Sequence, residues 1–315
     1  MGIITSTTLP APVQQSFSNK LLSVSVPYMI HKIPAELKTM PRQGGRVLRF
    51  RRYNPLATAP VPLGNSGISP PPQTASAINI DARPDFYGTY LILNEQVTLQ
   101  SQDPVLNQLV ERLGVSLRET EDELMRDMLA STATFVNCVS GTNGDNPTEI
   151  TRQDCDFVVR TLRGNNAYSF TSGIQGENKF GTAPVRDAYF SLSHTDMIGQ
   201  LDAVQGFISK WNYPSQDSTL DPEWGTVANI RFLLSSIGST TTAASLLGAT
   251  IYNNFVCGRE SFAAVEQDGY SAQFVYLPPQ FSGPLALNAT IGWKMAECPR
   301  ILNTTWVFNL RCTLA

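Results

Sequence analysis

The chain has few of the residues from which metal sites and catalytic sites are built. Its 315 residues include only two histidines, His31 and His194, and five cysteines. The cysteines are Cys138, Cys155, Cys257, Cys298 and Cys312. An odd number of cysteines without a Cys-x-x-Cys pair indicates neither a disulfide framework nor a zinc site. We therefore expect free, mostly buried thiols, as in proteins of a reducing cytoplasm.

Sequence motifs of catalysis are equally scarce. The chain contains no phosphate-binding loop, no Gly-x-Gly-x-x-Gly and no Gly-x-Ser-x-Gly. The segment Ser193-His194-Thr195-Asp196 holds the residue types of a hydrolytic triad, but triad members are neighbours in space and not in sequence. We interpret His194 as the end of a strand and Thr195 or Asp196 as the cap of a helix. The prediction is a protein that is not an enzyme, without catalytic, cofactor-binding or metal-ligating residues.

Long apolar runs and a high density of charge are absent as well. No stretch approaches the roughly 20 apolar residues of a membrane-spanning helix, and the first residues lack the pattern of a secretory signal. Hence no membrane partner is predicted. Charged residues make up 16% of the chain and hydrophobic residues 42%. This balance excludes an intrinsically disordered chain and leaves enough apolar material for a core.

The small net charge of −3 conceals an uneven distribution. Residues 1–55 contain eight basic side chains and one acidic side chain, a net charge of +7, so the remainder carries −10. A basic arm on an acidic body can bind nucleic acid, an anionic membrane or the acidic body of another copy. Composition alone favours none of the three strongly.

The first third of the chain lacks the pattern of a compact core. Residues 1–44 are basic, interrupted by proline and without periodicity, which predicts an extended arm that becomes ordered against a partner surface. Residues 45–53 alternate like a strand, but both of its faces are mixed. Residues 54–74 are rich in proline, which excludes a central strand, and residues 75–100 return to β-prone side chains. We predict a long two-stranded excursion with a proline-rich end.

The strongest single element is a helix from about residue 103 to residue 131. Asp103 suits an N-cap and Pro104 suits the first helical position. Apolar side chains then recur close to every 3.6 residues. These are Leu106, Leu109, Val110, Leu113, Leu117, Leu124 and Met128. The predicted outer face is charged and consists of Arg118, Glu119, Glu121, Asp122, Glu123, Arg126 and Asp127.

Shorter patterns complete the expected fold. A second helix is predicted at 151–162, a buried strand at 189–192 and a single strand across 225–234. The last strands alternate cleanly, with a bend expected at Pro299. Because no repeat of solenoid or propeller length is present, the sum predicts an α+β fold.

Several segments together carry a resemblance to a known family. They are Arg49-Phe50-Arg51-Arg52-Tyr53-Asn54-Pro55-Leu56-Ala57-Thr58-Ala59, Tyr87-Gly88-Thr89-Tyr90, Glu223-Trp224-Gly225-Thr226-Val227-Ala228-Asn229-Ile230-Arg231-Phe232, Ile291-Gly292-Trp293-Lys294 and Ile301-Leu302-Asn303. Across about residues 45–315 the chain resembles the major coat proteins of short-tailed phages, which have the Hong Kong 97-type capsid fold. The first segment is the most specific of these motifs.

The resemblance implies an architecture and a function. The implied regions are an N-terminal arm at 1–44, an extended hairpin called the E-loop at 45–95, a peripheral domain at 96–184 with a spine helix at about 103–131, an axial domain at 185–287, and a return to the peripheral domain at 288–315. The implied function is that of a major capsid protein. Such a protein self-assembles into hexamers and pentamers of an icosahedral shell that encloses double-stranded DNA. The expected location is the virion, assembled in the cytoplasm of a host bacterium.

Charged side chains of the E-loop and the spine helix are the candidate contacts between subunits. The hypothesis pairs arginines of one copy with glutamates of a neighbour. The residues are Arg46, Arg49, Arg51 and Arg52 in the E-loop, and Glu119, Glu121 and Glu123 in the spine helix. Ion pairs at the edge of an interface contribute little individually, but they set the register among many copies.

The resemblance also implies further partners. Some members of the fold are cross-linked through an E-loop lysine, but no lysine lies between Lys38 and Lys179 here. Non-covalent contacts or a separate cement protein are therefore expected to hold the shell. Some members of the fold also carry a long helical scaffolding segment at the N-terminus, which is later cleaved. Residues 1–44 are too short and too often interrupted by proline for such a segment. A separate scaffolding protein is therefore expected, along with a portal. Contact with packaged DNA would be non-specific and salt-sensitive.

Three alternatives stay open at this stage. An encapsulin-type compartment has the same fold but encloses enzymes in place of a genome. A phage tail or adhesion protein would bind a host sugar, and such proteins favour repeats or exposed aromatic patches. A soluble enzyme is the third alternative, which the missing site chemistry opposes.

Overall fold

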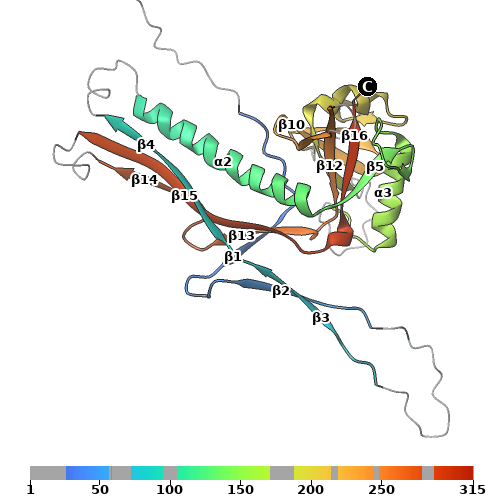
Figure 1. Ribbon diagram of the computed structural model, residues 1–315, viewed down its shortest axis with the longest axis horizontal. Helices are drawn as coiled ribbons and strands as arrows, with labels where there is room; N and C mark the ends of the chain where they lie inside the picture. The colour runs from blue at the N-terminus through green and yellow to red at the C-terminus, as the bar shows by residue number, and fades with distance from the viewer. Residues whose placement is uncertain are drawn as a thin grey trace, which may run out of the picture.

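The structure, a computed structural model, describes residues 26–56, 58, 72–94, 105–170, 188–213, 219–243, 248–278 and 287–314. These residues form three sheets of five, nine and two strands. Figure 1 shows an elongated molecule with a long helix and a narrow sheet at one end, a more compact body at the other, and a hairpin that projects between them. Mixed sheets with few helices confirm the predicted α+β class.

The five-stranded sheet is built around one long strand. Its strands are β1 (Glu36–Met40), β4 (Asp85–Asn94), β13 (Phe262–Gln267), β14 (Gln273–Leu277) and β15 (Asn288–Ile301). β15 pairs along one edge with β4, and along the other edge with β14 and then β13, in each case antiparallel. β1 extends the sheet by pairing parallel with β13. The N-terminal segment is therefore tied into the same sheet as the C-terminal strands.

The long helix α2 (Val105–Thr132) covers one face of this sheet. Leu113 and Leu117 pack against Ile291, Trp293 and Met295 of β15, and Figure 1 shows the helix running along β4 and β15. The predicted helix of 103–131 is confirmed within the described residues, and Leu113, Leu117 and Leu124 face the sheet at helical spacing. The expected cap residues, Asp103 and Pro104, lie outside the described residues.

The nine-stranded sheet forms the compact body. Its strands are β5 (Thr134–Val139), β6 (Thr142–Asn143), β7 (Tyr189–His194), β8 (Ile208–Ser209), β9 (Glu223–Val227), β10 (Ile230–Ser235), β11 (Thr240–Ala243), β12 (Ala249–Cys257) and β16 (Val307–Thr313). The order is β6-β5-β16-β12-β7-β10-β9-β8, with β11 beside β12. The helical segments around it are η1 (Thr195–Met197), α3 (Arg152–Gly164), α4 (Ile198–Ala203), η2 (Lys210–Asn212) and η5 (Thr304–Trp306).

Both faces of this sheet are buried, which explains why its strands are apolar on both sides. One face packs against α3 and α4 through side chains such as Val158, Leu162 and Leu201. The other face receives the end of α2, where Met125 and Leu129 are fully buried. α2 therefore connects the cores of both bodies. The predicted helix at 151–162 and the predicted buried strand at 189–192 are confirmed as α3 and β7.

Two local predictions were wrong for identifiable reasons. The strand expected across 225–234 is a hairpin of β9 and β10, because Ala228 and Asn229 adopt positive φ angles of 50° and 67°, as tight hairpin turns require. The bend expected at Pro299 is absent, and β15 continues through it opposite Ala264. The pairing with β4 ends at Glu297, so one edge of β15 is open there and the missing N–H is tolerated.

Each of the two large sheets takes strands from more than one of the expected domain ranges. β5, β6 and α3 fall within the range 96–184 but belong to the nine-stranded body. β13 and β14 fall within 185–287 but belong to the five-stranded sheet, and β16 lies within 288–315 but pairs with β12 and β5. Among the described residues of the range 45–95, the hairpin consists of β2 (Leu48–Tyr53) and β3 (Ala77–Ala82), whereas β4 pairs with β15.

Candidate subunit-contact surfaces

The hairpin β2–β3 is anchored to the molecule at its base. Leu48, Phe50 and Ala82 share one face, since residues directly opposite in an antiparallel pair point to the same side. They pack against Met40 of β1 and Val265 of β13. Beyond this contact the hairpin has no core of its own, and a two-stranded ribbon of this kind is marginal in water.

The opposite face of the hairpin carries Arg49 and Arg51. Arg49 donates from Nε and Nη2 to the two carboxylate oxygens of Asp81, at 2.7 and 3.0 Å. This hydrogen bond lowers the pKa of Asp81. Arg51 donates from Nε to Asn79 Oδ1 at 3.0 Å. Both contacts are exposed and contribute little to stability, but Arg49 already has a carboxylate partner in its own chain.

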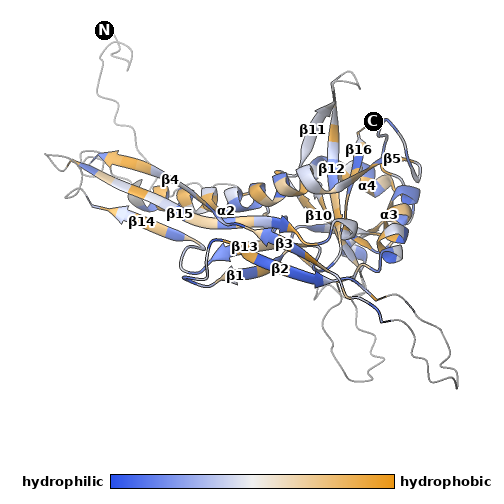
Figure 2. Ribbon diagram, turned by 60° about the horizontal axis from the view of Figure 1, so that its bottom comes forward, coloured by the Kyte–Doolittle hydropathy of each residue, from blue (hydrophilic) through white to orange (hydrophobic). Residues whose placement is uncertain are grey.

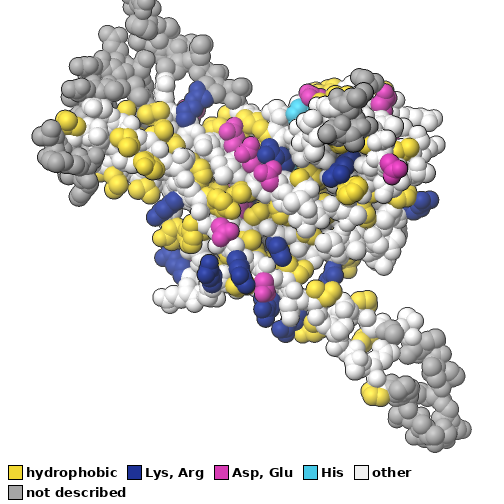
Figure 3. All heavy atoms as spheres, viewed as in Figure 1, with side chains coloured by type: hydrophobic (Ala, Val, Ile, Leu, Met, Phe, Trp, Pro, Cys, Tyr) yellow, Lys and Arg dark blue, Asp and Glu magenta, His cyan; other side chains and the backbone are white. Residues whose placement is uncertain are grey.

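Arg46 and Arg52 are also exposed. Arg52 lies on the apolar face of the hairpin, beyond the anchored base, where a groove of about 350 Å³ separates the hairpin from the ends of α2 and β15. The groove is lined in part by Arg52, Ile78, Ile80, Met128, Arg300 and Ile301. In Figure 3 basic side chains gather along the hairpin and the neighbouring edge of the five-stranded sheet. This surface suits an acidic, partly apolar partner segment.

The three candidate glutamates of α2 have different environments. Glu119 is partly exposed, and Glu123 is half exposed, 3.5 Å from Arg126 on the same helix. Glu121 faces inward, 3.4 Å from Lys32, and burial raises its pKa. Among the described residues, the ion pairs of these glutamates go to Lys32 and Arg126 and not to the hairpin arginines. The structure does not bring the two predicted sets together within one subunit.

The face of the five-stranded sheet that points away from α2 is unusually apolar. Phe86, Tyr90 and Ile92 of β4 are 72%, 66% and 63% exposed, and Leu277 of β14 is 47% exposed. The strand register places these side chains on one face of the sheet and Trp293, which packs against α2, on the other face. Figure 2 shows apolar residues along β4 and near its outer end. These exposed side chains are candidates for a protein contact, since soluble monomers rarely expose a large apolar patch.

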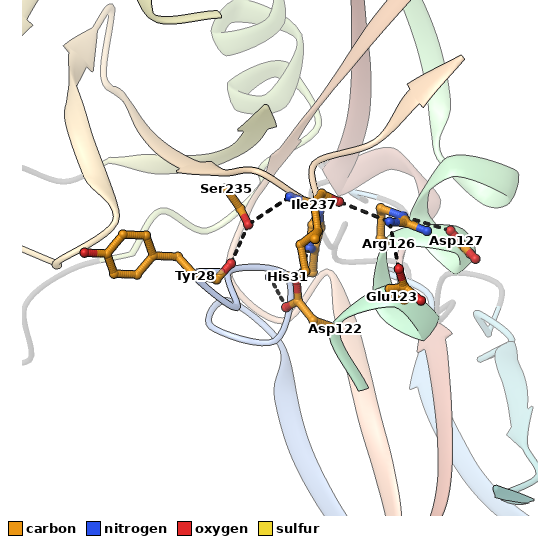
Figure 4. Close-up of polar contacts among 8 residues, drawn as sticks. All are labelled: Tyr28, His31, Asp122, Glu123, Arg126, Asp127, Ser235 and Ile237. Atoms are coloured by element: carbon orange, nitrogen blue, oxygen red, sulfur yellow. Dashed lines mark hydrogen bonds and ion pairs between the residues drawn. The ribbon is translucent and has the colours of Figure 1, made fainter. Parts of the chain in front are cut away.

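Sequence reasoning missed the residues at which the N-terminal segment crosses α2 (Figure 4). The backbone N–H of His31 donates to Asp122 Oδ1 at 2.7 Å, and its Nδ1–H donates to Oδ2 at 2.6 Å. Ser235 of β10 donates from Oγ to the carbonyl of Tyr28. Asp122 was predicted on the outer face of the helix but is 1% exposed. No sequence signal could have shown this, because the partners are 91 positions apart.

Lys32, the next residue of the N-terminal segment, contacts α2 and the five-stranded sheet. Its Nζ lies 2.8 Å from Glu266 of β13, 3.4 Å from Glu121 of α2 and 3.4 Å from Glu297 of β15. On the other side, Arg126 of α2 donates to the carbonyl of Ile237, 3.1 Å away in the turn after β10. Together these contacts link the N-terminal segment, α2 and both sheets.

The residues with catalytic potential have structural roles. His31 is engaged with Asp122, and His194 ends β7, where its Nδ1 accepts from the backbone N–H of Asp196 at 3.1 Å. The helix cap is thus His194 itself and not Thr195 or Asp196. All five cysteines are free, as predicted, and four are buried; burial raises the pKa of the Cys155 thiol to about 12.

Within the described ranges no group of three or more His, Cys, Asp or Glu side chains is placed to hold a metal ion. None of the helices in the same ranges is both long enough and apolar enough to cross a membrane.

The fold described above is similar to solved phage capsid and head structures. No protein-family model and no curated protein sequence matches the chain. Among solved structures, the capsid of Ralstonia phage GP4 matches with a TM-score of 0.70 at 11% identity, covering 96% of both chains. The head structure of the Helicobacter pylori phage KHP40 matches with 0.66 at 10% identity, covering 100% of this chain and 98% of that one.

A third match agrees with these two. The capsid structure of cyanophage P-SCSP1u gives a TM-score of 0.65 at 12% identity, over 96% of this chain and 94% of that chain. At such low identity the likeness establishes the fold and not the activity. The chain thus has the phage capsid fold over nearly its whole length.

Proposed function

We propose that this protein is the major capsid protein of a tailed phage and that it self-assembles into an icosahedral shell enclosing double-stranded DNA. The likeness to phage capsid and head structures over at least 96% of the chain is the observation that carries the proposal. The projecting hairpin and the exposed apolar strand β4 support it, because both features need partner surfaces. An encapsulin-type compartment has no separate observation in its favour.

We further propose that the architecture is of the Hong Kong 97 type. In this interpretation the hairpin β2–β3 is the E-loop, α2 is the spine helix and the five-stranded sheet belongs to the peripheral domain. Most of the nine-stranded body corresponds to the axial domain, which surrounds the centre of each hexamer or pentamer. The strand pairings support these assignments, with the sheet-based boundaries in place of those expected from the sequence.

The ion pairs within the subunit narrow the set of charged residues that we propose for contacts between subunits. Arg46, Arg51 and Arg52 are exposed without a carboxylate partner among the described residues, so they stay candidates for pairing with Glu119 and Glu123 of a neighbour. The intrachain contacts of Arg49 with Asp81 and of Glu121 with Lys32 make these two residues weaker candidates. Pairs at an exposed interface contribute about 0.2–1 kcal/mol each, but a shell repeats them in many copies.

The proposal includes partners beyond other copies of the chain. A separate scaffolding protein and a portal would direct closed assembly, and a cement protein could strengthen a shell that has no E-loop lysine for cross-linking. Packaged DNA would be contacted non-specifically. The proposed location is the virion, with assembly in the bacterial cytoplasm.

The direct test is to express the chain in bacteria with and without the proteins encoded beside it, and to examine the product by light scattering and negative-stain electron microscopy. We expect closed shells or ring-shaped capsomers tens of nanometres across, on the order of other protein assemblies of this fold class. A monodisperse monomer under all conditions, including co-expression with the scaffolding protein, would contradict the proposal.

A further inference from the structure

One lysine and three glutamates meet where the N-terminal segment crosses the five-stranded sheet. Lys32 lies within 3.4 Å of carboxylates from α2, β13 and β15. Glu297 of β15 is the most enclosed of these, with its side chain 2% exposed. In the strand register, Glu266 of β13 is directly opposite Glu297 on one side, and Asp85 of β4 is opposite on the other. Like charges in directly opposite positions destabilise a sheet.

Among the described residues, Lys32 is the one group whose charge compensates for the burial of Glu297. Among the described residues neither of its carboxylate oxygens has a hydrogen-bond partner, and its contact with Lys32 is an ion pair at 3.4 Å. Glu266 holds the same ammonium more closely, at 2.8 Å. A buried carboxylate without donors, beside other carboxylates, favours the protonated form.

We propose that Glu297 is a proton-binding group that controls how firmly α2 and the N-terminal segment are held on the five-stranded sheet. With the proton bound, Lys32 is shared by Glu121 and Glu266, and the contact is closed. When the proton is lost, a third carboxylate charge lies beneath α2 with the same single ammonium. Repulsion among the carboxylates then loosens the contact.

The surroundings of Glu297 support this direction. The charged and titratable groups that interact with it or pair with it are Lys32 of the N-terminal segment, Glu121 of α2, Glu266 of β13, Asp85 and Tyr87 of β4, and Cys298 of β15. The groups next to these are His31, paired with Asp122, and Arg118, which interacts with Glu121. Burial raises the pKa of Glu297 from its ordinary value near 4.5 to about 7. Attraction to Lys32 opposes this rise, and repulsion from Glu121 and Glu266 adds to it. Hydrogen bonding to Glu266 raises the pKa of Lys32 despite the cost of burial, so the lysine stays charged.

The sign of the pH effect follows from these values. Between pH 4.5 and 7 the closed state holds a proton that the opened state has released, so closure weakens as the pH rises through this range. With these two pKa values, the equilibrium for local opening increases about tenfold between pH 6 and pH 8. Below about pH 4.5 the carboxyl group of Glu297 is protonated in both states, so it no longer makes the opening equilibrium depend on pH.

Hydrogen exchange of the full-length chain tests the inference. We expect peptides covering residues 28–40 and 113–125 to exchange about tenfold faster at pH 8 than at pH 6, after correction for the intrinsic rate. Glu297→Gln keeps the shape but cannot ionise, so its pH dependence should fall below about threefold. Glu149→Gln, the same change at an exposed glutamate, should keep the tenfold change.

Equal pH dependence in the wild type and in Glu297→Gln would overturn the inference. If that variant does not fold, infrared spectra of the wild type decide the matter. A carboxylic acid band must disappear as the pH rises from 6 to 8, and its absence at pH 6 would also overturn the inference. The contact lies within one subunit, so this test is independent of whether the chain forms shells.

Discussion

The pair formed by His31 and Asp122 shows how a buried polar contact fixes the path of an otherwise irregular segment. Both side chains are 1% exposed, and the carboxylate accepts from the backbone N–H and from the ring of the same histidine. Ile30, next to them, is fully buried among Met125 and Leu129. The apolar contact of Ile30 stabilises the packing of the segment on α2. The polar contact of His31 with Asp122 fixes the position along the helix at which the segment binds.

Removal of the Asp122 carboxylate should therefore be costly. In Asp122→Ala, two donors of His31 are left buried without an acceptor, and we expect a loss of about 3 kcal/mol in the free energy of unfolding. Asp122→Asn keeps the volume and one acceptor, so it should lose less, about 1–2 kcal/mol. Urea unfolding of the unassembled chain measures both changes.

A neighbouring residue gives the control for this prediction. Glu123→Ala removes a carboxylate at the next position of the same helix, where the side chain is half exposed. Its effect should stay within about 0.5 kcal/mol. If Asp122→Ala were no more destabilising than Glu123→Ala, the proposed anchoring of the N-terminal segment would be wrong.

At the scale of elements, α2 and the β9–β10 hairpin show what a sequence pattern can and cannot predict. The helix was predictable because Leu113 and Leu117 repeat at the helical period and pack on one partner, β15. The hairpin was missed because Ala228 stands at a turn position where positive φ is rarely adopted by non-glycine residues. Tertiary pairing with β7 and β8 overrides this local preference.

The turn gives a prediction for stability. Ala228 has a φ of 50°, which is costly for a residue with a Cβ. Ala228→Gly removes this strain but increases the entropy of the unfolded chain, so we expect a net gain of about 0.5 kcal/mol. Asn229→Ala, at a φ of 67°, should instead lose about 1 kcal/mol, since asparagine tolerates this conformation better than alanine.

Thermal unfolding of the two variants and the wild type measures both changes. The opposite signs are the informative feature, because a general intolerance of the turn to substitution would destabilise both variants. A decrease in melting temperature for Ala228→Gly would show that the turn is not strained in the folded protein.

At the scale of the molecule, the overall fold was predictable, but the sheet to which each C-terminal strand belongs was not. Short motifs such as Arg49–Ala59 carry enough information to indicate the fold family. Sheet membership cuts across the expected ranges because β15 is one strand of 14 residues in one sheet, and β16 follows it after a short 3-10 turn in the other. Burial of Glu121 and Asp122 depends on a segment some 90 residues away in sequence, which no periodicity within α2 can show.

The same scale gives the prediction for contacts between subunits. If Arg52 of one copy pairs with Glu119 of a neighbour, Arg52→Glu should reduce the yield of closed shells several-fold, because it places like charges together in every copy. Glu119→Arg should have a similar effect. The double variant restores opposite charges and should recover most of the yield, as expected for directly coupled residues.

Arg49→Glu is the matched comparison on the same strand. Its guanidinium is bound to Asp81 of its own chain, so Glu119→Arg should not rescue any assembly defect that it causes. Shell yield measured by sedimentation and electron microscopy separates these cases. If all of these variants assembled normally, the charged side chains of the hairpin would have no role in subunit contact. The exposed apolar residues of β4 would then be the principal candidates, because their burial does not depend on charge.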